Sequence, residues 1–344
     1  MRQSIAQGVS VMMVSTFKNR ADLAIAQGAL TNSKRPSTFV EGIYPTHAHS
    51  GSGCYLYADK KTYVDYYGAL GSNLLGYGHP IIREAIVSRF ALGATLSLSS
   101  ELEVELAERL KEIFLFTDLW KFTKTGSEAC GAAIKIARAF TGRDLVMSDG
   151  YHGNYDDFIS MTPPALGIPK RDWMSKLDNA HLSRAAAVII EPVQLDWSPE
   201  RREWLKDLRE QCTKHGTVLI FDEIITGFRW PKLSVSKDWG IFPDILLIGK
   251  AMAGGLPLSG IGGRKDIMNC GEYFISGTFF GETVSMAACM ALVNLMSRDG
   301  SKHSIVDLWE SGKIFLEKFN ALSKDLQIVG YPTRGAFQGN DLTK

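Results

Sequence analysis

Short, continuous apolar runs are the dominant pattern of the chain beyond about residue 120. Each run is bounded by polar or glycine residues, and helical patterns such as Arg201–His215 lie between some of them. Continuous apolar strands that alternate with helices indicate a parallel sheet with both faces covered. The pattern therefore predicts an α/β domain whose strands are Leu145–Met147, Ala186–Ile190, Val218–Phe221 and Ile245–Ile248.

The N-terminal part of the chain has a different pattern. Residues 39–67 contain short β-prone runs separated by Gly-Ser and Asp-Lys-Lys turns, which predicts a small antiparallel element. Further helices are expected over 81–90, 101–113, 126–140, 283–297 and 305–322, with a strand over 326–330. We therefore expect an N-terminal segment over 1–78, a large domain over 79–298 and the start of a small C-terminal domain over 299–344.

Composition sets the broad class of protein. The 344 residues suggest about two domains, and 45% apolar with 22% charged residues is typical of globular proteins. Lys and Arg total 38 against 37 acidic residues, so no global basic field exists for nucleic acid or an anionic membrane. The five cysteines include no CxxC pair, and no apolar run reaches the length of about 18 residues that a membrane span needs. We expect a cytoplasmic protein with reduced thiols.

Three of the predicted strands end in an ionisable residue, namely Glu191, Asp222 and, two positions beyond its strand, Lys250. Ligands of open α/β sheets bind at the carboxyl edge of the strands, so these side chains are expected to converge. Lys250 lies between an apolar strand and the glycine-rich turn 251–255, where desolvation would lower its pKa and favour a Schiff-base nucleophile. An ordinary lysine that extends from a strand end to solvent is the alternative.

Asp222 closes a buried strand, where a carboxylate is costly unless it meets a cation or a metal. A protonated pyridine nitrogen is one such cation. The alternatives are an N-cap for a following helix and a magnesium ligand. His47 and His49 have no third ligand in a metal-binding pattern, so we expect no metal site there.

Two segments are candidate phosphate sites. Gly126 and Ser127 lie where a loop leads into a helix, although a plain serine N-cap would explain the same residues. Thr278, flanked by glycine ahead of the helix at 283, is the second candidate, with an ordinary loop as its alternative. Tyr151 follows a strand and could stack on a flat ring, or could be a core tyrosine in a turn. The sequence contains neither a Walker loop nor a GxSxG nucleophile motif.

The order and spacing of six segments resemble the class III pyridoxal-phosphate (PLP) aminotransferases, most closely the glutamate-1-semialdehyde aminomutase branch. The resemblance extends from about residue 28 to 335, and its most specific part is the pair Asp222 and Lys250, 28 positions apart. The six segments are Thr125–Ala129, Tyr151–Gly153, Glu191–Val193, Asp222–Arg229, Lys250–Gly255 and Gly277–Phe279.

The resemblance implies a PLP-dependent transferase of fold type I. Such a fold has a large domain with a mainly parallel seven-stranded sheet between helices, and a small domain built from the N- and C-terminal parts. The implied reaction transfers an amino group between an amine or amino acid and a keto or aldehyde acceptor. An intramolecular amine shift of the aminomutase type, and a PLP-binding protein without turnover, remain alternatives. A metal-dependent enzyme that uses Asp222 and Glu191 is a more distant one.

The resemblance also implies a role for each site residue. Lys250 would hold the cofactor as an internal aldimine and then move the substrate proton, and Asp222 would pair with the pyridine nitrogen. Gly126 and Ser127 would bind the phosphate. Tyr151 and Ile224 would cover opposite faces of the ring, and His152 would be a further cofactor-binding residue. Glu191 and Gln194 would lie near the phenolic edge of the ring. Thr278 would reach the phosphate of the partner subunit's cofactor, so the resemblance implies a homodimer.

The sequence departs from that branch at four places. Thr125-Gly126-Ser127 replaces the usual Ser-Gly-Thr, which keeps a hydroxyl at the phosphate. The loop around 163–167, a gating lid in the aminomutases, looks trimmed. A tryptophan expected in 66–74 is missing, with Leu70 near its place, and only the first helix and strand of the C-terminal domain are expected before Lys344.

Overall fold

The computed structural model describes residues 16–40, 43–155, 172–173, 179–297, 304–322 and 324–339. The chain divides into two compact units, Met1–Tyr66 and Tyr67–Lys344. The expected lid loop around 163–167 lies outside the described residues. Within the described part of the chain, no helix is both long and apolar enough to cross a membrane.

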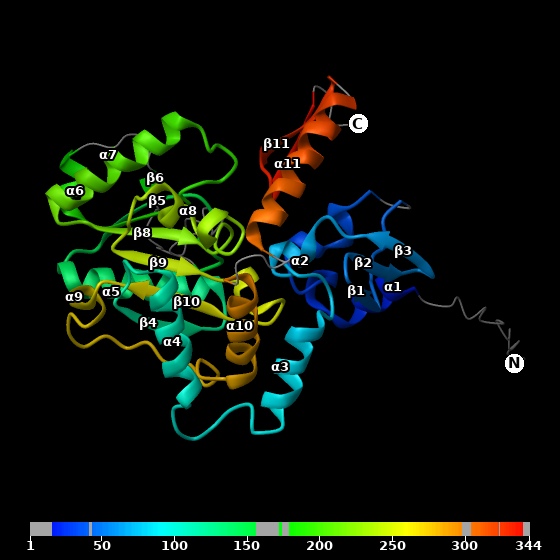
Figure 1. Cartoon of the computed structure of the whole chain (residues 1–344), viewed down its shortest axis with the longest axis horizontal. Coiled ribbons are helices and arrows are strands. Elements are labelled where there is room, and N and C mark those ends of the chain that lie inside the picture. The colour runs from blue at the N-terminus through cyan, green and yellow to red at the C-terminus, as the bar shows by residue number, and fades with distance from the viewer. Residues whose placement is uncertain are drawn as a thin grey trace, which may run out of the picture. The chain divides into compact units, whose positions relative to one another are not determined.

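The first unit, blue in Figure 1, contains a three-stranded antiparallel sheet in the order β1–β2–β3. Its two longer strands occupy the β-prone runs, and the tight turn between them places Asp59 and Lys60 at positive φ. The elements are α1 (Phe17–Ala24), three short 3-10 turns η1 (Ala26–Gly28), η2 (Asn32–Lys34) and η3 (Pro36–Thr38), and strands β1 (Ser50–Ser52), β2 (Tyr55–Ala58) and β3 (Lys61–Val64).

The second unit is built on a mixed sheet, which confirms the predicted α/β class. The neighbours from β9 through β8, β7 and β5 to β6 are parallel, whereas β10 is antiparallel to both β4 and β9. The last strand has only two residues, so six strands make up the body of the sheet. In sheet order the strands are β4 (Leu119–Thr123), β10 (Ser259–Gly263), β9 (Ile245–Ile248), β8 (Val218–Glu223), β7 (Ala185–Ile190), β5 (Leu145–Asp149) and β6 (Asp172–Trp173).

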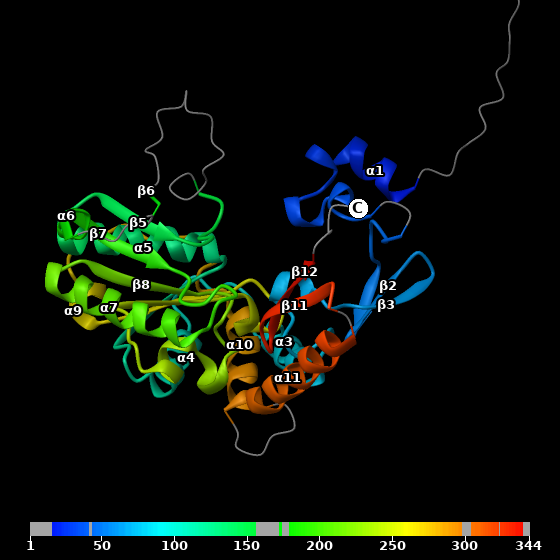
Figure 2. The same ribbon diagram turned by 90° about the horizontal axis from the view of Figure 1, so that it is seen from above.

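Helices cover both faces of this sheet (Figure 2). Ile220 of β8 packs in one core with α5 (Gly126–Thr141), whereas its neighbour Leu219 packs in another with α7 (Pro199–His215). Successive side chains of a strand point to opposite faces, so a strand covered on both sides is apolar at every position. This explains why the apolar runs predicted four of the strands.

Strands β4 and β10 were not predicted, and for β10 the sequence gives the reason. In β10, a Cβ at Gly262 would lie only 2.6 Å from the Trp120 side chain of β4, and a Cβ at Gly260 would lie 3.0 Å from it. The glycines therefore make room for an indole ring against the sheet. Glycine lowers β-propensity, so the pattern gives no sign of a strand here.

A third group of helices packs beside β9, where α10 contacts both α3 and α4. Ser100 and Glu103 form a capping box that begins α4. The chain then forms α11 and an antiparallel hairpin, of which only the first strand was predicted. The remaining elements are α2 (Gly68–Gly71), α3 (Pro80–Phe90), α4 (Glu101–Ile113), α6 (Asn179–Arg184), η5 (Pro231–Leu233), α8 (Val235–Trp239), η6 (Lys250–Ala253), α9 (Lys265–Met268), α10 (Thr283–Met296), α11 (Ile305–Leu322), β11 (Leu326–Tyr331) and β12 (Arg334–Gly339).

Candidate functional site

A cavity of about 360 Å³ lies at the carboxyl edge of the parallel strands. Its lining joins the loop that begins α5, the segments after β5, β7 and β8, and the turn after β9. Gln194 and Thr278 are not among the described residues that line it. The predicted site residues that do line it are Gly126, Ser127, Tyr151, His152, Glu191, Asp222, Ile224 and Lys250.

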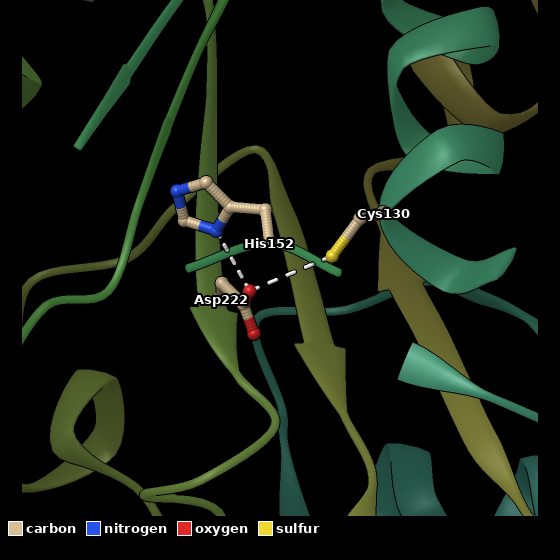
Figure 3. A group of neighbouring side chains, drawn as sticks. All are labelled: Cys130, His152 and Asp222. Carbon is tan, nitrogen blue, oxygen red and sulfur yellow. Dashed lines mark hydrogen bonds and ion pairs between the residues drawn. The ribbon is translucent and has the colours of Figure 1, made fainter. Parts of the chain in front are cut away.

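Asp222 is 4% exposed, at the end of β8. Its Oδ1 accepts a hydrogen bond from the backbone N–H of Ile224 at 3.0 Å. Its Oδ2 lies 2.8 Å from His152 Nδ1 and accepts from the Cys130 thiol at 3.5 Å (Figure 3). The residues that follow form turns, so the alternative of a helix N-cap is wrong. The carboxylate is instead fixed in one orientation by three donors.

Cys130, His152 and Asp222 form a buried cluster whose potential ligand atoms lie within 4.8 Å of one another (Figure 3). A metal would need the thiolate, but burial and the Asp222 charge raise the pKa of Cys130 well above its usual range. The His152 Nε2 lies 3.0 Å from the backbone oxygen of Asp149. The geometry is therefore that of a hydrogen-bonded support for the carboxylate.

Lys250 follows β9 in the turn η6 and has a φ of +40°, a conformation that a residue with a side chain rarely adopts. Strained backbone of this kind is concentrated at functional sites. Burial lowers the pKa of Lys250, although Asp222 and Glu191 oppose the effect. The lowered pKa increases the share of neutral amine, which is the nucleophilic form.

The start of α5 provides an anion site. Thr125 caps the helix with Glu128 in a capping box, so the alternative that Ser127 is merely the N-cap is wrong. The Ser127 hydroxyl instead accepts from the backbone N–H of Asn154 at 3.1 Å. The first N–H groups of a helix have no partner within it and attract anions such as phosphate.

Glycines shape this part of the cavity. A Cβ at Gly126 would lie 2.8 Å from Ile224 Cδ1, and a Cβ at Gly153 would overlap the Ser127 side chain. Because neither residue has a side chain, the backbone at Gly126 and Gly153 borders directly on the space in front of the α5 N-terminus. Room for a bulky anion and exposed N–H groups together fit a phosphate ester.

Glu191 is 5% exposed and accepts from the backbone N–H of Tyr151 at 2.8 Å through Oε1. Its Oε2 has no hydrogen-bond partner among the described residues, and Arg334 Nη1 lies 3.7 Å away. Burial raises the pKa of this carboxyl. Gln194 lies beside it, since a Cβ at Gly150 would come within 3.2 Å of Gln194 Nε2 and 2.7 Å of Glu191 Oε1.

Thr278 is exposed, in the segment between α9 and α10. Lys124 lines the cavity without having been predicted, and its Nζ forms a 2.8 Å ion pair with Glu282. Cys130 and Arg334 were also missed. Cys130 directly follows the segment Thr125–Ala129, so a signal was adjacent in the sequence, whereas nothing in the sequence connects Arg334 with residue 191.

These features together fit PLP. The cavity offers a lysine for its aldehyde, a fixed carboxylate for its pyridine nitrogen and a helix N-terminus for its phosphate. The cofactor therefore matches the donor chemistry of the residues present, independently of any relative.

Known proteins give the same picture. The class III aminotransferase family model matches residues 41–176 and 170–344. Glutamate-1-semialdehyde 2,1-aminomutase 2 of Lachnoclostridium phytofermentans is 33% identical, over 82% of this chain and 73% of that protein.

Solved structures agree. The FumI protein of Sphingopyxis sp. MTA144, in its PLP internal aldimine form, is 26% identical, with a TM-score of 0.87 over 94% of this chain and 83% of that one. A β-phenylalanine aminotransferase from Variovorax paradoxus is 27% identical, with a TM-score of 0.77 over 91% of this chain and 76% of that one. The chain therefore belongs to the class III aminotransferases, which are PLP-dependent enzymes of fold type I.

Proposed function

We propose that this enzyme transfers an amino group between an amine or amino acid and a keto or aldehyde acceptor, with PLP bound in the cavity described above. The observation that carries the proposal is the convergence of Lys250, Asp222 and the N-terminus of α5 on that one cavity. When bound, PLP supplies an electrophilic aldehyde and a ring that accepts electron density from the reacting carbon.

Lys250 would bind the aldehyde carbon through Nζ and later carry the proton that leaves or returns to the reacting carbon. Its lowered pKa supports both roles, because a neutral amine is both a nucleophile and a base. Asp222 would hold the proton of the pyridine nitrogen. Three donors already orient its carboxylate, so it would not need to reorganise when the cofactor binds.

The remaining residues would position the cofactor. Gly126 and Ser127 would bind the phosphate at the start of α5, while Tyr151 and Ile224 would cover opposite ring faces. His152 would act through Asp222, which it contacts at 2.8 Å. The carboxyl group of Glu191 would lie near the phenolic oxygen of the ring, with Gln194 beside it.

An intramolecular amine shift is the second candidate, supported by the 33% identity to an aminomutase. The two reactions differ in where the amine is found at the end. A transferase loads the amine onto a separate acceptor, whereas a mutase returns it to the same carbon skeleton. Mass analysis with a 15N-labelled amino donor and an unlabelled acceptor separates them.

Reduction of the PLP-loaded protein with borohydride tests the proposal. The label is expected on the peptide that contains Lys250, and the Lys250→Ala variant should lose it. Lys237→Ala is a matched control, because burial also lowers the pKa of Lys237, yet this residue does not line the cavity. Labelling of another lysine in the wild-type protein would contradict the assignment.

Thr278 would reach the phosphate of a partner subunit, so the active unit would be a homodimer. Its neighbours Phe274 and Phe279 are 82% and 60% exposed, which is unusual for aromatic residues and favours a covered surface. The Thr283 hydroxyl donates to the backbone oxygen of Gly93 at 2.9 Å, which ties the loop after Gly93 to the start of α10. In that loop Leu98 is 83% exposed, a further apolar side chain that a partner subunit could cover. Light scattering over a dilution series, with and without PLP, tests this. A stable monomer with undiminished PLP affinity would contradict a shared site.

A further inference from the structure

Arg229 is a buried cation without an ionic partner. Its side chain is 7% exposed, at the end of the turn that follows β8. No ion pair reaches it among the described residues, and its Nη1 is buried with no hydrogen-bond partner there. Burying a guanidinium in this way is costly unless an anion meets it at some stage of the enzyme's work. No contact within the described residues accounts for a buried positive charge at this position.

The guanidinium lies next to the lysine of the site. Gly71, at φ +82°, has no side chain, and a Cβ there would lie 3.6 Å from Arg229 Nη2 and 3.9 Å from Lys250 Cδ. The two cationic side chains therefore border the same small space. Ser72, the next residue, lines the cavity, so this space adjoins it. The positive charge of Arg229 is also among the causes that lower the pKa of Lys250.

The two carboxylates of the cavity contact groups other than Arg229, although Glu191 Oε2 accepts no hydrogen bond from a described residue. Asp222 bonds His152 and Cys130, and Glu191 bonds the Tyr151 backbone with Arg334 at 3.7 Å. Besides burial, two other groups bear on the pKa of Arg229: the buried phenol of Tyr331, which raises it, and a further cation, Arg334, which lowers it. The guanidinium thus adds positive charge beside Lys250 that no described carboxylate neutralises.

We propose that Arg229 binds the carboxylate of the substrate, so that the enzyme takes amino acids and oxo acids in preference to uncharged amines and carbonyls. The proposal rests on the function proposed above and names its substrate class. A guanidinium can bind a carboxylate with two parallel hydrogen bonds, which would orient the substrate as well as neutralise the buried charge. Next to Lys250, that contact would hold the amino group of the substrate close to the reacting lysine.

The test uses the PLP-loaded enzyme and matched donors. β-Alanine, 4-aminobutanoate and 5-aminopentanoate are each compared with their amides, which have the same shape without the charge. The loss of cofactor absorbance near 420 nm gives kcat/KM for each donor. Loss of a charge-assisted hydrogen bond is expected to reduce the acid-over-amide preference by about tenfold to a hundredfold in Arg229→Gln. The acid-to-amide ratio is the readout, because losing the Arg229 charge also acts on Lys250 and therefore on both members of each pair.

Two further variants control the result. Arg202→Gln removes an exposed arginine that bonds the backbone oxygen of Trp239 outside the cavity, and it should keep the wild-type preference. Arg229→Lys keeps the charge but loses the two-pronged geometry, so it should show an intermediate preference. It also keeps the test valid if Arg229→Gln does not fold.

A binding measurement separates this inference from the proposed function. Glutarate cannot react, so calorimetry of glutarate with the PLP-loaded enzyme reports carboxylate binding even if no donor turns over. We expect binding to wild type that weakens by about tenfold or more in the Arg229 variants. Arg229 variants that keep the wild-type acid-over-amide preference would overturn the proposal. So would a wild-type enzyme that neither prefers the acids nor binds glutarate. Weakened PLP affinity with unchanged glutarate binding would do so as well, because the anion would then be the cofactor phosphate.

Discussion

Asp222→Asn separates the chemical role of this residue from its structural role. Asparagine has the same shape but no charge, and one of its two terminal atoms donates hydrogen bonds instead of accepting them. In the native site, Oδ1 accepts from Ile224 and Oδ2 faces His152 Nδ1 and the Cys130 thiol. The amide must therefore place its nitrogen in the Oδ2 position to keep the Ile224 bond.

The histidine can accommodate that change. Its Nε2 lies 3.0 Å from the Asp149 carbonyl oxygen, so it can donate there while Nδ1 accepts from the new amide. Only the weak thiol donor of Cys130 loses its acceptor. We therefore expect the free energy of unfolding of Asp222→Asn to fall by no more than about 1–2 kcal/mol.

The rate should change far more than the stability. Removing one preorganised electrostatic contact from a buried active site typically raises the barrier by about 2.7–4 kcal/mol. At 1.36 kcal/mol for each factor of ten, this corresponds to a loss of roughly a hundredfold to a thousandfold in the amine half-reaction.

Stopped-flow absorbance gives the half-reaction rate, and urea denaturation followed by circular dichroism gives the stability. Asp207→Asn, which alters an exposed carboxylate on α7, is the control and should change neither. A PLP-loaded Asp222→Asn protein with a rate within about threefold of wild type, under 1 kcal/mol in barrier, would refute the electrostatic role. A stability loss well above 3 kcal/mol would refute the hydrogen-bond rearrangement instead.

Three further substitutions test other parts of the site. Glu223→Gln should lower the free energy of unfolding by about 2–5 kcal/mol in urea denaturation. Four hydrogen-bond donors converge on this buried carboxylate, whereas glutamine has only one acceptor oxygen. A loss under about 1 kcal/mol would contradict this. Lys250 binds fewer protons when folded than when unfolded, between its lowered pKa and the ordinary value of 10.5, so PLP-free wild type should gain stability as the pH rises through that window. Lys250→Met should lack this gain. If plots of the free energy of unfolding against pH run parallel for wild type and Lys250→Met over that range, Lys250 is not the group responsible. Gly126→Ala places a Cβ 2.8 Å from Ile224 Cδ1, so it should weaken the affinity for PLP by about tenfold but not that for pyridoxal, which has no phosphate; equal losses in the two titrations would disprove the phosphate role.

The sequence predicted the parts of the fold in which burial leaves a pattern. Strands β7, β8 and β9 are covered on both faces, so they appear as apolar runs, and their C-terminal residues identify one edge of the sheet. Because parallel strands share that edge, the strand pattern alone is enough to place Glu191, Asp222 and Lys250 together. All three side chains line one cavity.

Side chains that approach the site from other elements left no such pattern. Cys130 reaches Asp222 from the buried face of α5, where an apolar residue would fit the helix pattern equally well. Gly260 and Gly262 form a strand by pairing with β4 and β9, and they are glycines because Trp120 needs the room beside them. In each case the partner, not the local sequence, determines the role, so sequence periodicity carries no information about it. The predicted division at residues 78 and 298 depends on similar long-range contacts and stays a prediction.

The C-terminal hairpin illustrates the same limit most clearly. From the sequence, the residues after 299 were expected to be only the beginning of a small domain, yet the β11–β12 turn meets two loops of the cavity. Arg334 Nη1 donates to the backbone oxygen of Gln194 at 3.0 Å, and the Thr333 hydroxyl donates to the backbone oxygen of Arg229 at 2.7 Å. One turn thus contacts both the loop that follows Glu191 and the cation to which we assign the substrate carboxylate. Both contacts join residues more than 100 positions apart, so no local pattern in the sequence could have predicted them.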